Sequence, residues 1–449
     1  MGKFIKDINN GGIIMNIVVA GTGYVGLVTG VCLAEKGHNV TCVDINQEKI
    51  NLMRSGKSPI YEKDLEELMQ KNKARLNYTI DAKSAYKQAD VIFIGVGTPE
   101  KKDGSANLRY VYEVGKEIAE SIKKDCLVVL KSTVPIGTNN KLEKYINSNV
   151  KNDVKVELIS NPEFLSQGTA VHDTLYAKRI VIGTKSKKAE TIMRQVYDAF
   201  NIEYVMTDRE SAEMIKYASN DFLALKISYI NEIANLCEIV GANITDVARG
   251  MGLDNRIGNK FLNAGIGYGG SCFPKDTKAL NWLGNYYDYE LKTIKAAIEV
   301  NENQKIKLIK KARKYYDSFD GLNVAVLGLS FKPNTDDLRD APSLDCIPIL
   351  LDDGAKIKAY DPVAENNYKK IYPTEIEYCK SLEDTLKDTD ICFIFTEWDF
   401  VKNMDTELFE KLMKKPIVLD GRNCFDINEM KARKILYESI GRKIIDNIS

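Results

Sequence analysis

A glycine-rich turn near the start of the chain constrains its fold more than any other feature. Gly21-x-Gly23-x-x-Gly26 stands between a short apolar strand, residues 16–20, and a helical stretch that ends near residue 36. Such glycines allow a tight turn, close approach of a pyrophosphate to the backbone, and close packing of the helix on the strand. The pattern predicts that a dinucleotide contacts Gly21, Gly23, Tyr24, Val25 and Gly26.

An acidic residue follows this turn at the spacing that a dinucleotide site requires. Asp44 ends the next apolar strand, 18 residues after Gly26. A carboxylate there accepts hydrogen bonds from a ribose diol and repels a 2′-phosphate, so we expect NAD rather than NADP. A glycine turn alone also ends strands for structural reasons, and it is the strand, turn, helix and acid together that favour a cofactor site.

Apolar strands alternate with helical stretches over two parts of the chain. This alternation predicts parallel, doubly wound sheets, that is, an α/β fold with two Rossmann-like domains. The strands of the first series, which reaches about Val205, are 16–20, 40–44, 91–95, 127–130 and 156–160. The strands of the second series are 323–328, 356–361, 391–395 and 417–420.

A long helical segment separates the two series. Residues 210–240 contain neither Gly nor Pro and are long for a globular helix, so they predict a connector or a subunit interface, with a homodimer as the expected state. We predict an N-terminal Rossmann domain at 15–205, a central helical region at 206–318 and a C-terminal Rossmann-like domain at 319–449. Residues before Met15 are left out of this prediction.

Composition argues against several classes of function. Lys+Arg and Asp+Glu both number 63, so charge gives no case for a nucleic acid or a membrane as partner. No apolar run reaches the length of a membrane span, and no secretory signal segment is evident. The nine cysteines form no CxxC pair and indicate a reducing cytoplasm. Only two histidines are present, which nearly excludes histidine-based metal or triad chemistry, and no metal is expected.

A cysteine lies within a second glycine-rich segment, residues 265–276. Pro274 predicts that a helix begins just after Cys272, because Pro is favoured at the first helical position. The sulfur would then face unpaired backbone N–H groups and the positive end of the helix dipole, which favour thiolate. Asp276 follows four residues later, close enough to act on the same chemistry. A buried, inert cysteine is the alternative that these local features leave open.

Further polar residues follow strands or share a helix face. Thr98 and Thr133 lie in loops at the carboxyl ends of strands, where the ligand crevice of a parallel sheet forms. Glu163 also follows a strand and would bind or activate a water there. Lys216 and Asn220 are one helical turn apart. Ordinary turn chemistry, a helix-start carboxylate and a solvated lysine are the alternatives for these residues.

Several short motifs run through the chain in a fixed order. They are Gly21-Thr-Gly-Tyr-Val-Gly-Leu27, Ser132-Thr-Val-Pro135, Asn161-Pro-Glu-Phe-Leu165, Lys216-Tyr-Ala-Ser-Asn220, Phe261-Leu-Asn-Ala-Gly265, Gly267-Tyr-Gly-Gly-Ser-Cys-Phe-Pro-Lys-Asp276, Phe331-Lys-Pro-Asn-Thr-Asp-Asp-Leu-Arg339 and Thr396-Glu-Trp398. This set resembles the UDP-glucose/GDP-mannose dehydrogenase family, and the resemblance covers essentially everything after Met15.

The resemblance implies that C6 of UDP-glucose is oxidised twice, with two NAD, to give UDP-glucuronate. An aldehyde needs an added nucleophile before a second hydride can leave, so Cys272 would form a thiohemiacetal and then a thioester that water hydrolyses. By resemblance, Lys216 and Asn220 would stabilise the oxyanion at C6. The groups that would manage protons and water are Asp276, Thr133 and Glu163.

The resemblance also assigns binding residues. NAD would contact Thr98, Thr133, Lys275 and Arg339, and Lys275 would bind a ligand or order its loop rather than do chemistry. The UDP-sugar, for which the C-terminal domain is the expected binding domain, would contact Glu163, Phe164, Leu165, Lys216, Asn220, Arg256, Phe261, Leu262, Asn263, Gly265, Gly269, Lys332 and Arg422. Arg256 would reach a neighbouring subunit, and surface salt bridging is the alternative for each of these cations.

One position departs from the family pattern. Many relatives carry a second acid four residues after the Glu of Asn-Pro-Glu-Phe-Leu, where this chain has Gln167. The task of that acid would pass to Glu163 or to Asp276 with its water, unless the acid only oriented a water, as an amide also does.

Two other kinds of function stay open at this point. A sister enzyme would act on GDP-mannose or a UDP-N-acetylhexosamine. Phe273 and Tyr268 favour UDP-glucose over GDP-mannose, and Ser271 stands where the N-acetylhexosamine enzymes usually carry histidine. An inactive NAD-binding regulatory protein is the second alternative, which the intact set of Lys216, Asn220, Cys272 and Asp276 opposes.

Overall fold

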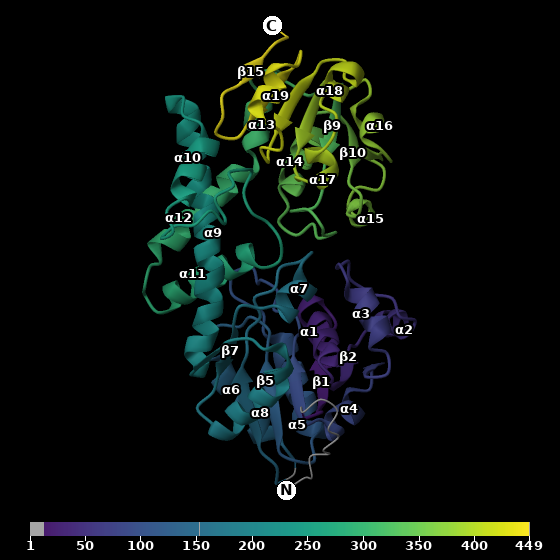
Figure 1. Ribbon diagram of the computed structural model, residues 1–449, viewed down its shortest axis with the longest axis vertical. Helices are drawn as coiled ribbons and strands as arrows, with labels where there is room; N and C mark the ends of the chain where they lie inside the picture. The colour runs from purple at the N-terminus through teal and green to yellow at the C-terminus, as the bar shows by residue number, and fades with distance from the viewer. Residues whose placement is uncertain (1–12, 152, 449) are drawn as a thin grey trace. The chain divides into compact units, whose positions relative to one another are not determined.

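The computed structural model describes residues 13–151 and 153–448 of the chain (Figure 1). The chain divides into two compact units, one that ends at Ser219 and one that begins at Asn220. Each unit contains one β-sheet with its own strands. Residues 1–12, most of the segment that the prediction left out, lie outside the described part.

The first unit contains an eight-stranded sheet. In sheet order its strands are β3 (Leu76–Thr79), β2 (Asn39–Val43), β1 (Asn16–Ala20), β4 (Val91–Ile94), β5 (Cys126–Leu130), β6 (Val156–Ser160), β7 (Ile180–Gly183) and β8 (Tyr204–Thr207). Neighbouring strands are parallel except β6 and β7. The order reverses between β1 and β4, and ligands bind outside the carboxyl ends of strands at such a switch point.

Helices cover both faces of this sheet, because successive side chains of a strand point to opposite faces. In β1, Ile17 and Val19 belong to one hydrophobic core, and Val18 and Ala20 belong to the other. The helices are α1 (Tyr24–Glu35), α2 (Gln47–Arg54), α3 (Leu65–Lys71), α4 (Ala82–Gln88), α5 (Arg109–Ser121), α6 (Thr138–Asn149), α7 (Ala170–Leu175) and α8 (Lys187–Tyr197). Residues 24–35 are apolar almost all round and bury most of their side chains.

The second unit contains a seven-stranded sheet and a group of helices before it. The strands, in sheet order, are β11 (Ile376–Tyr378), β10 (Lys356–Tyr360), β9 (Asn323–Leu327), β12 (Ile391–Ile394), β13 (Ile417–Asp420), β14 (Leu436–Ser439) and β15 (Ile445–Asp446). The helices are α10 (Ile244–Gly252), α11 (Phe273–Tyr286), α12 (Lys292–Lys305), α13 (Lys307–Ala312), α14 (Pro342–Asp352), α15 (Glu365–Tyr368), α16 (Leu382–Leu386), α17 (Asp399–Lys402), α18 (Glu407–Leu412) and α19 (Ile427–Lys431).

The second sheet repeats the order of the first six strands of the first sheet. Asp361 ends β10 as Asp44 ends β2, but its surroundings differ. Its carboxylate is 1% exposed and accepts hydrogen bonds from the N–H groups of Leu329 (2.8 Å) and Ser330 (3.2 Å). The indole N–H of Trp398 donates a further bond at 3.1 Å. Hydrogen-bond donors of the protein itself therefore surround the carboxylate of Asp361.

The predicted α/β fold, with two Rossmann-like sheets and a long helix between their series, is confirmed. The long helix is α9 (Arg209–Val240), predicted at 210–240. The strands that the prediction did not assign are β3, β7, β8, β11, β14 and β15. Most are short edge strands, and in β8 every residue is partly exposed. In β14, Glu438 interrupts the apolar pattern, and it is buried because Lys311 pairs with it at 2.8 Å.

Candidate active site

The predicted nucleotide turn lies between β1 and α1, at the switch point of the first sheet. Gly21 has a φ of 94°, a left-handed conformation that favours glycine. A Cβ on Gly26 would lie 2.0 Å from the carbonyl oxygen of Gly21, so turn and helix pack too closely for another residue. Around Gly23, by contrast, no neighbouring atom lies within 4 Å of where a Cβ would stand. This open N-terminus of α1 fits a pyrophosphate.

Asp44 stands beside this turn with most of its acceptor positions filled. Its Oδ2 accepts from the N–H (3.0 Å) and hydroxyl (2.5 Å) of Thr22, and its Oδ1 accepts from the N–H of Asn46 (2.9 Å). Burial opposes ionisation, but these hydrogen bonds outweigh it and hold the pKa of Asp44 below its usual value. A carboxylate has about four acceptor positions, which leaves one for a ribose hydroxyl. Ile45, 89% exposed, adds apolar surface that the sequence prediction missed.

Replacing Asp44 with asparagine is expected to lower the preference for NAD over NADP by about 10- to 100-fold. This range corresponds to the free energy that one hydrogen bond to a charged group contributes. The amide still accepts a hydrogen bond but no longer repels a 2′-phosphate. The ratio of kcat/KM with the two cofactors measures the effect. Asp81→Asn, at the N-terminus of α4, is the control. An unchanged ratio in Asp44→Asn would show that Asp44 does not face the ribose.

Glu163 and Lys216, predicted separately, meet as a buried ion pair. Glu163 Oε1 lies 2.9 Å from Lys216 Nζ, and the side chains are 6% and 4% exposed. Glu163 Oε2 accepts from the N–H of Leu165 at 2.8 Å. The Lys216 ammonium lies 5.4 Å from the centre of the Phe164 ring, and the Arg179 guanidinium carbon lies 4.0 Å from it. The sequence prediction missed Arg179.

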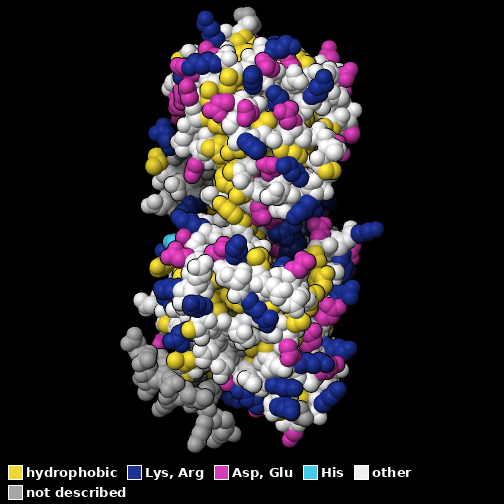
Figure 2. Space-filling model, turned by 90° about the vertical axis from the view of Figure 1, so that its right-hand side faces the viewer, with side chains coloured by type: hydrophobic (Ala, Val, Ile, Leu, Met, Phe, Trp, Pro, Cys, Tyr) yellow, Lys and Arg dark blue, Asp and Glu magenta, His cyan; other side chains and the backbone are white. Residues whose placement is uncertain are grey.

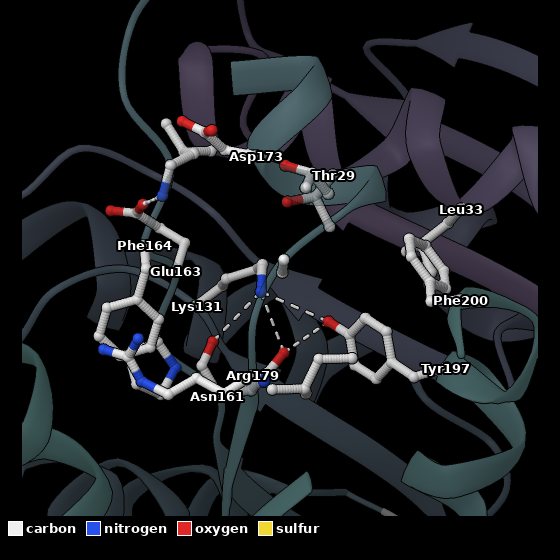
Figure 3. A pocket seen from close by; sticks show the side chains of 15 residues that line it. Thr29, Leu33, Lys131, Asn161, Glu163, Phe164, Asp173, Arg179, Tyr197 and Phe200 are labelled. Carbon is white, nitrogen blue, oxygen red and sulfur yellow. Dashed lines mark hydrogen bonds between the residues drawn. The ribbon is translucent and has the colours of Figure 1, made fainter. Parts of the chain in front are cut away.

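Lys131 is a second buried lysine, and it lines a cavity of about 50 Å³ with Glu163 (Figure 3). Its Nζ donates to Oδ1 (3.1 Å) and the carbonyl (3.4 Å) of Asn161 and to the Tyr197 hydroxyl (3.4 Å). These partners are neutral, and burial lowers the pKa of Lys131 to about 8. The hydroxyl of Thr29 lines the same cavity without a hydrogen-bond partner among the described residues, so the cavity suits ordered water.

Replacing Lys131 with methionine is expected to stabilise the protein at neutral pH. The pKa of Lys131 falls from 10.5 to about 8 on folding, which corresponds to about 3 kcal/mol against the folded state below pH 8. The folded protein binds this proton less readily than the unfolded chain, so the penalty disappears as pH rises from 8 to 10.5. Denaturant unfolding at pH 7 and pH 10, with exposed Lys123→Met as control, checks this. Destabilisation at pH 7 would contradict it.

Cys272 lies at the start of α11 in the second unit, as predicted. The helix begins at Phe273 with Pro274 in its first turn. The N–H of Asp276 donates to the Cys272 carbonyl at 2.8 Å, and the Ser271 hydroxyl lies 3.6 Å from the sulfur. Cys272 is exposed, whereas the other described thiols are buried or half-buried: Cys32, Cys42, Cys126, Cys237, Cys346, Cys379, Cys392 and Cys424. Burial raises the pKa of Cys32, Cys42 and Cys126 to about 12.

Asp276 and Asn220 are in direct contact within the second unit. The side-chain N–H of Asn220 on α9 donates to Asp276 Oδ2 at 2.7 Å. Asp276 Oδ1 pairs with the ammonium of Lys275, and Asp276 is 1% exposed. An amide carries two N–H donors, so this contact uses one of those available to Asn220. Asn220 and Asp276 are buried and Lys275 is half-buried, and the three side chains form one cluster at the first turn of α11.

The glycine segment before Cys272 is held by Arg422, which follows β13. Its Nε donates to the carbonyl of Phe395 (2.8 Å) and its Nη1 to that of Gly267 (2.9 Å). Its Nη2 donates to the carbonyl of Phe331 at 3.3 Å. Arg422, predicted as a substrate contact, therefore uses its donors to tie the glycine segment to the loops that follow β12 and β9.

Backbone crowding fixes other predicted substrate residues. A Cβ on Gly269 would lie 2.3 Å from a neighbouring carbonyl oxygen, so only glycine fits there. Gly265 donates to Asn231 Oδ1 at 2.8 Å and accepts from Gln304 at 2.7 Å. Phe261 has a φ of 63°, which is strained for a non-glycine residue and holds the loop in a bent conformation.

Of the remaining predicted cations, Arg339 and Arg256 are exposed and Lys332 is half-buried. Arg339 is 60% exposed and pairs with Asp337 at 2.5 Å, and Arg256 is 89% exposed and pairs with Asp254 at 2.6 Å. Lys332 lies over an aromatic ring, with its Nζ 5.6 Å from the ring centre. These contacts match the alternative interpretation, in which the cations form surface salt bridges and pack against neighbouring side chains. Binding of a ligand by these cations stays a prediction.

The two predicted threonines tie neighbouring loops together. Thr98 donates its hydroxyl proton to the carbonyl of Thr133 at 2.8 Å, which links the loops after β4 and β5. The Thr133 side chain is half-buried. The hydroxyl of Thr98 therefore stabilises the loop conformation, whereas the hydroxyl of Thr133 takes no part in this hydrogen bond.

Within residues 13–151 and 153–448, no group of three or more His, Cys, Asp or Glu side chains is arranged to hold a metal ion. In the same ranges no helix combines the length and apolar character needed to cross a membrane.

Comparison with known proteins identifies the family. The family's NAD binding domain matches residues 15–201 of this chain, its central domain matches residues 210–303, and its UDP binding domain matches residues 325–427. UDP-glucose 6-dehydrogenase YwqF of Bacillus subtilis is 49% identical over 96% of this chain and 98% of its own length, and TuaD of that species is 47% identical over 96% and 94%. The structure of a UDP-glucose dehydrogenase from Pyrobaculum islandicum aligns with a TM-score of 0.91 at 34% identity, covering 97% of this chain and 100% of that one. This chain belongs to the UDP-glucose/GDP-mannose dehydrogenase family, and its first part is the family's NAD binding domain.

Proposed function

We propose that this protein is an NAD-dependent UDP-glucose 6-dehydrogenase, which oxidises C6 of UDP-glucose in two steps to UDP-glucuronate. Relatives of that name, 49% and 47% identical over nearly the whole chain, support the substrate. The observation that carries the proposal is Cys272, an exposed thiol at the start of α11 in a chain whose other described thiols are buried or half-buried. Such a thiol is what the second oxidation needs.

The first oxidation converts the C6 alcohol to an aldehyde. Bound NAD supplies the hydride acceptor for this step and for the next. In the proposal Glu163 takes the proton of the hydroxyl, directly or through a water. Lys216 lies against that carboxylate and stabilises negative charge on the C6 oxygen as it develops.

The second oxidation passes through the sulfur of Cys272. The thiolate adds to the aldehyde carbon, and the thiohemiacetal loses hydride to become a thioester. Asp276, with Thr133, takes the proton of the attacking water, the carbon–sulfur bond breaks, and the electron pair returns to Cys272 as thiolate. Asn220 donates to the C6 oxygen through the N–H that Asp276 leaves available.

The stoichiometry of NADH formation tests this proposal. Purified protein, UDP-glucose and excess NAD should give two NADH per sugar, with UDP-glucuronate as the product. GDP-mannose and UDP-N-acetylmannosamine, assayed in parallel, should react far more slowly. One NADH per UDP-glucose, or none, would rule out the four-electron oxidation, and faster reaction of either other sugar nucleotide would reassign the substrate.

We further propose a homodimer formed through α9. Phe222, Tyr229 and Leu236 recur every seven residues on this helix, which places them on one stripe. They are 61%, 47% and 52% exposed, and such a run of large apolar side chains suits a second copy of the same helix. In this proposal residues 206–318 join the subunits and carry active-site residues, residues 15–205 bind NAD, and residues 319–449 bind the UDP-sugar. The cysteines, which form no disulfide within the described residues, favour a cytoplasmic location.

Replacing both Phe222 and Leu236 with glutamate is expected to convert the dimer to monomer, because four buried charges would face one another across the twofold axis. Sedimentation velocity measures the mass in solution. The control is Tyr289→Glu, since Tyr289 is 68% exposed but lies outside α9. A dimer that survives the double substitution, or a monomeric parent protein, would contradict the proposal.

A further inference from the structure

A buried acid without a partner lies beside the Asp276 cluster. Asp221 follows Asn220 on α9 and is 1% exposed. Neither of its carboxyl oxygens has a hydrogen-bond partner among the described residues. Asp361 is equally buried, yet backbone and side-chain donors surround its carboxylate. An ionised carboxylate without such donors is strongly unfavourable in a buried place, so Asp221 is a candidate to hold a proton.

The groups that face Asp221 do not offer it a counter-charge. Asp276 and Lys275 act on it from α11, and Tyr268 faces it from the preceding segment. The ammonium of Lys275 is paired with Asp276, and Asn220 also donates to Asp276. Burial, and then the charge on Asp276, raise the pKa of Asp221 from 3.8 to about 8, against a smaller opposing effect of Lys275.

We propose that Asp221 is a positioning residue that stays protonated in the working enzyme and so leaves Asp276 as the carboxylate that Lys275 and Asn220 hold. The inference deepens the proposed function and rests on it. A second carboxylate at this point would compete for the same ammonium and amide, and would draw them away from Asp276.

The proton on Asp221 matters most for hydrolysis of the thioester. In that step the water oxygen bonds to the carbonyl carbon, its proton passes to Asp276, and the carbon–sulfur bond breaks to return a thiolate to Cys272. Negative charge therefore moves within the site while Asp276 accepts a proton. If Asp221 loses its own proton in alkaline solution, it competes with Asp276 for Lys275 and Asn220, and turnover should decline above about pH 8.

Asp221→Asn tests the protonation state without reference to activity, because asparagine has the shape of the neutral acid and does not ionise. The folded protein keeps this proton up to about pH 8, whereas the unfolded group loses it near 3.8, so the parent protein loses stability relative to the variant as pH rises between these values. The difference in Tm should therefore grow in favour of Asp221→Asn from pH 4 to pH 8. Infrared difference spectra at pH 7 should show the carbonyl stretch of a protonated acid that the variant lacks.

The matched control is Asp361→Asn, which should lose stability at pH 8 because several donors lose a charged acceptor. If the Tm difference for Asp221→Asn does not grow with pH, and the infrared band is absent, Asp221 is ionised and the inference is wrong.

The pH dependence of kcat distinguishes a positioning role of Asp221 from a purely structural role. The ratio of kcat at pH 9 to kcat at pH 7 should be about tenfold higher in Asp221→Asn than in the parent protein, since one pH unit beyond the pKa of Asp221 removes most of its proton. A structural role would change kcat by the same factor at both pH values, and that result would overturn the inference. If the parent protein yields no NADH from UDP-glucose, the proposed function fails, while the Tm and infrared results still report on Asp221.

Discussion

Cys272→Ser is expected to lower the rate of UDP-glucuronate formation by at least about 1,000-fold, as loss of a catalytic nucleophile does in other enzymes. The first hydride transfer needs no thiol, so reaction up to the aldehyde should survive. A serine hydroxyl is a weak nucleophile, and any ester that it forms at C6 hydrolyses slowly compared with a thioester. The expected result is at most one NADH per sugar, or an ester adduct on the protein, read by absorbance and by intact-protein mass.

Cys379→Ser is the matched control for this experiment. Cys379 is buried and directly follows β11, and burial raises its pKa. Its replacement should leave two NADH per sugar. Full activity in Cys272→Ser would remove the covalent intermediate from the mechanism, whereas loss of activity in both variants would point to misfolding.

Lys216→Met is expected to have the second-largest effect and to act on both catalysis and stability. Loss of one group that stabilises an oxyanion lowers kcat by about 100- to 1,000-fold. The same change leaves Glu163 buried without its partner at 2.9 Å, which costs about 3–5 kcal/mol in the free energy of unfolding. Steady-state kinetics and denaturant unfolding measure the two effects.

A double variant distinguishes the two roles of this ion pair. Glu163→Gln combined with Lys216→Met removes both charges, so most of the lost stability should return while kcat stays low. If activity returns with stability, the low kcat of Lys216→Met reflects a disturbed fold, and Lys216 has no direct part in the reaction. If stability does not return, the cost lies in packing around Phe164 and not in an unpaired charge.

Local sequence patterns predicted the parts of the site that one short segment determines. The strand, glycine turn and acid at Asp44 lie in one β-α-β unit, so their spacing in the sequence fixes their positions in space. The start of α11 was predicted because Pro274 is compatible with a first helical turn and directly follows a glycine segment.

Such local patterns could not predict contacts between segments that are far apart in the sequence. Glu163 and Lys216 are separated by 53 positions, and no local signal shows that their charges neutralise each other. The sequence patterns did not single out Lys131, because its cavity is formed by segments far apart in sequence. Arg422 was predicted from motif resemblance, which gives no sign that its donors bind backbone carbonyls.

The two sheets share a strand order, and an aspartate follows the second strand of that order in each sheet. The two aspartates have different roles. Asp44 retains an acceptor position beside an open glycine turn, whereas backbone N–H groups and an indole fill the surroundings of Asp361. Within the described residues the second sheet thus offers no matching place for a dinucleotide. Under the proposed reaction, both cofactor molecules of one turnover must visit the same cleft in succession. Reduced cofactor therefore has to depart, and a fresh molecule arrive, while the half-oxidised sugar remains on the protein.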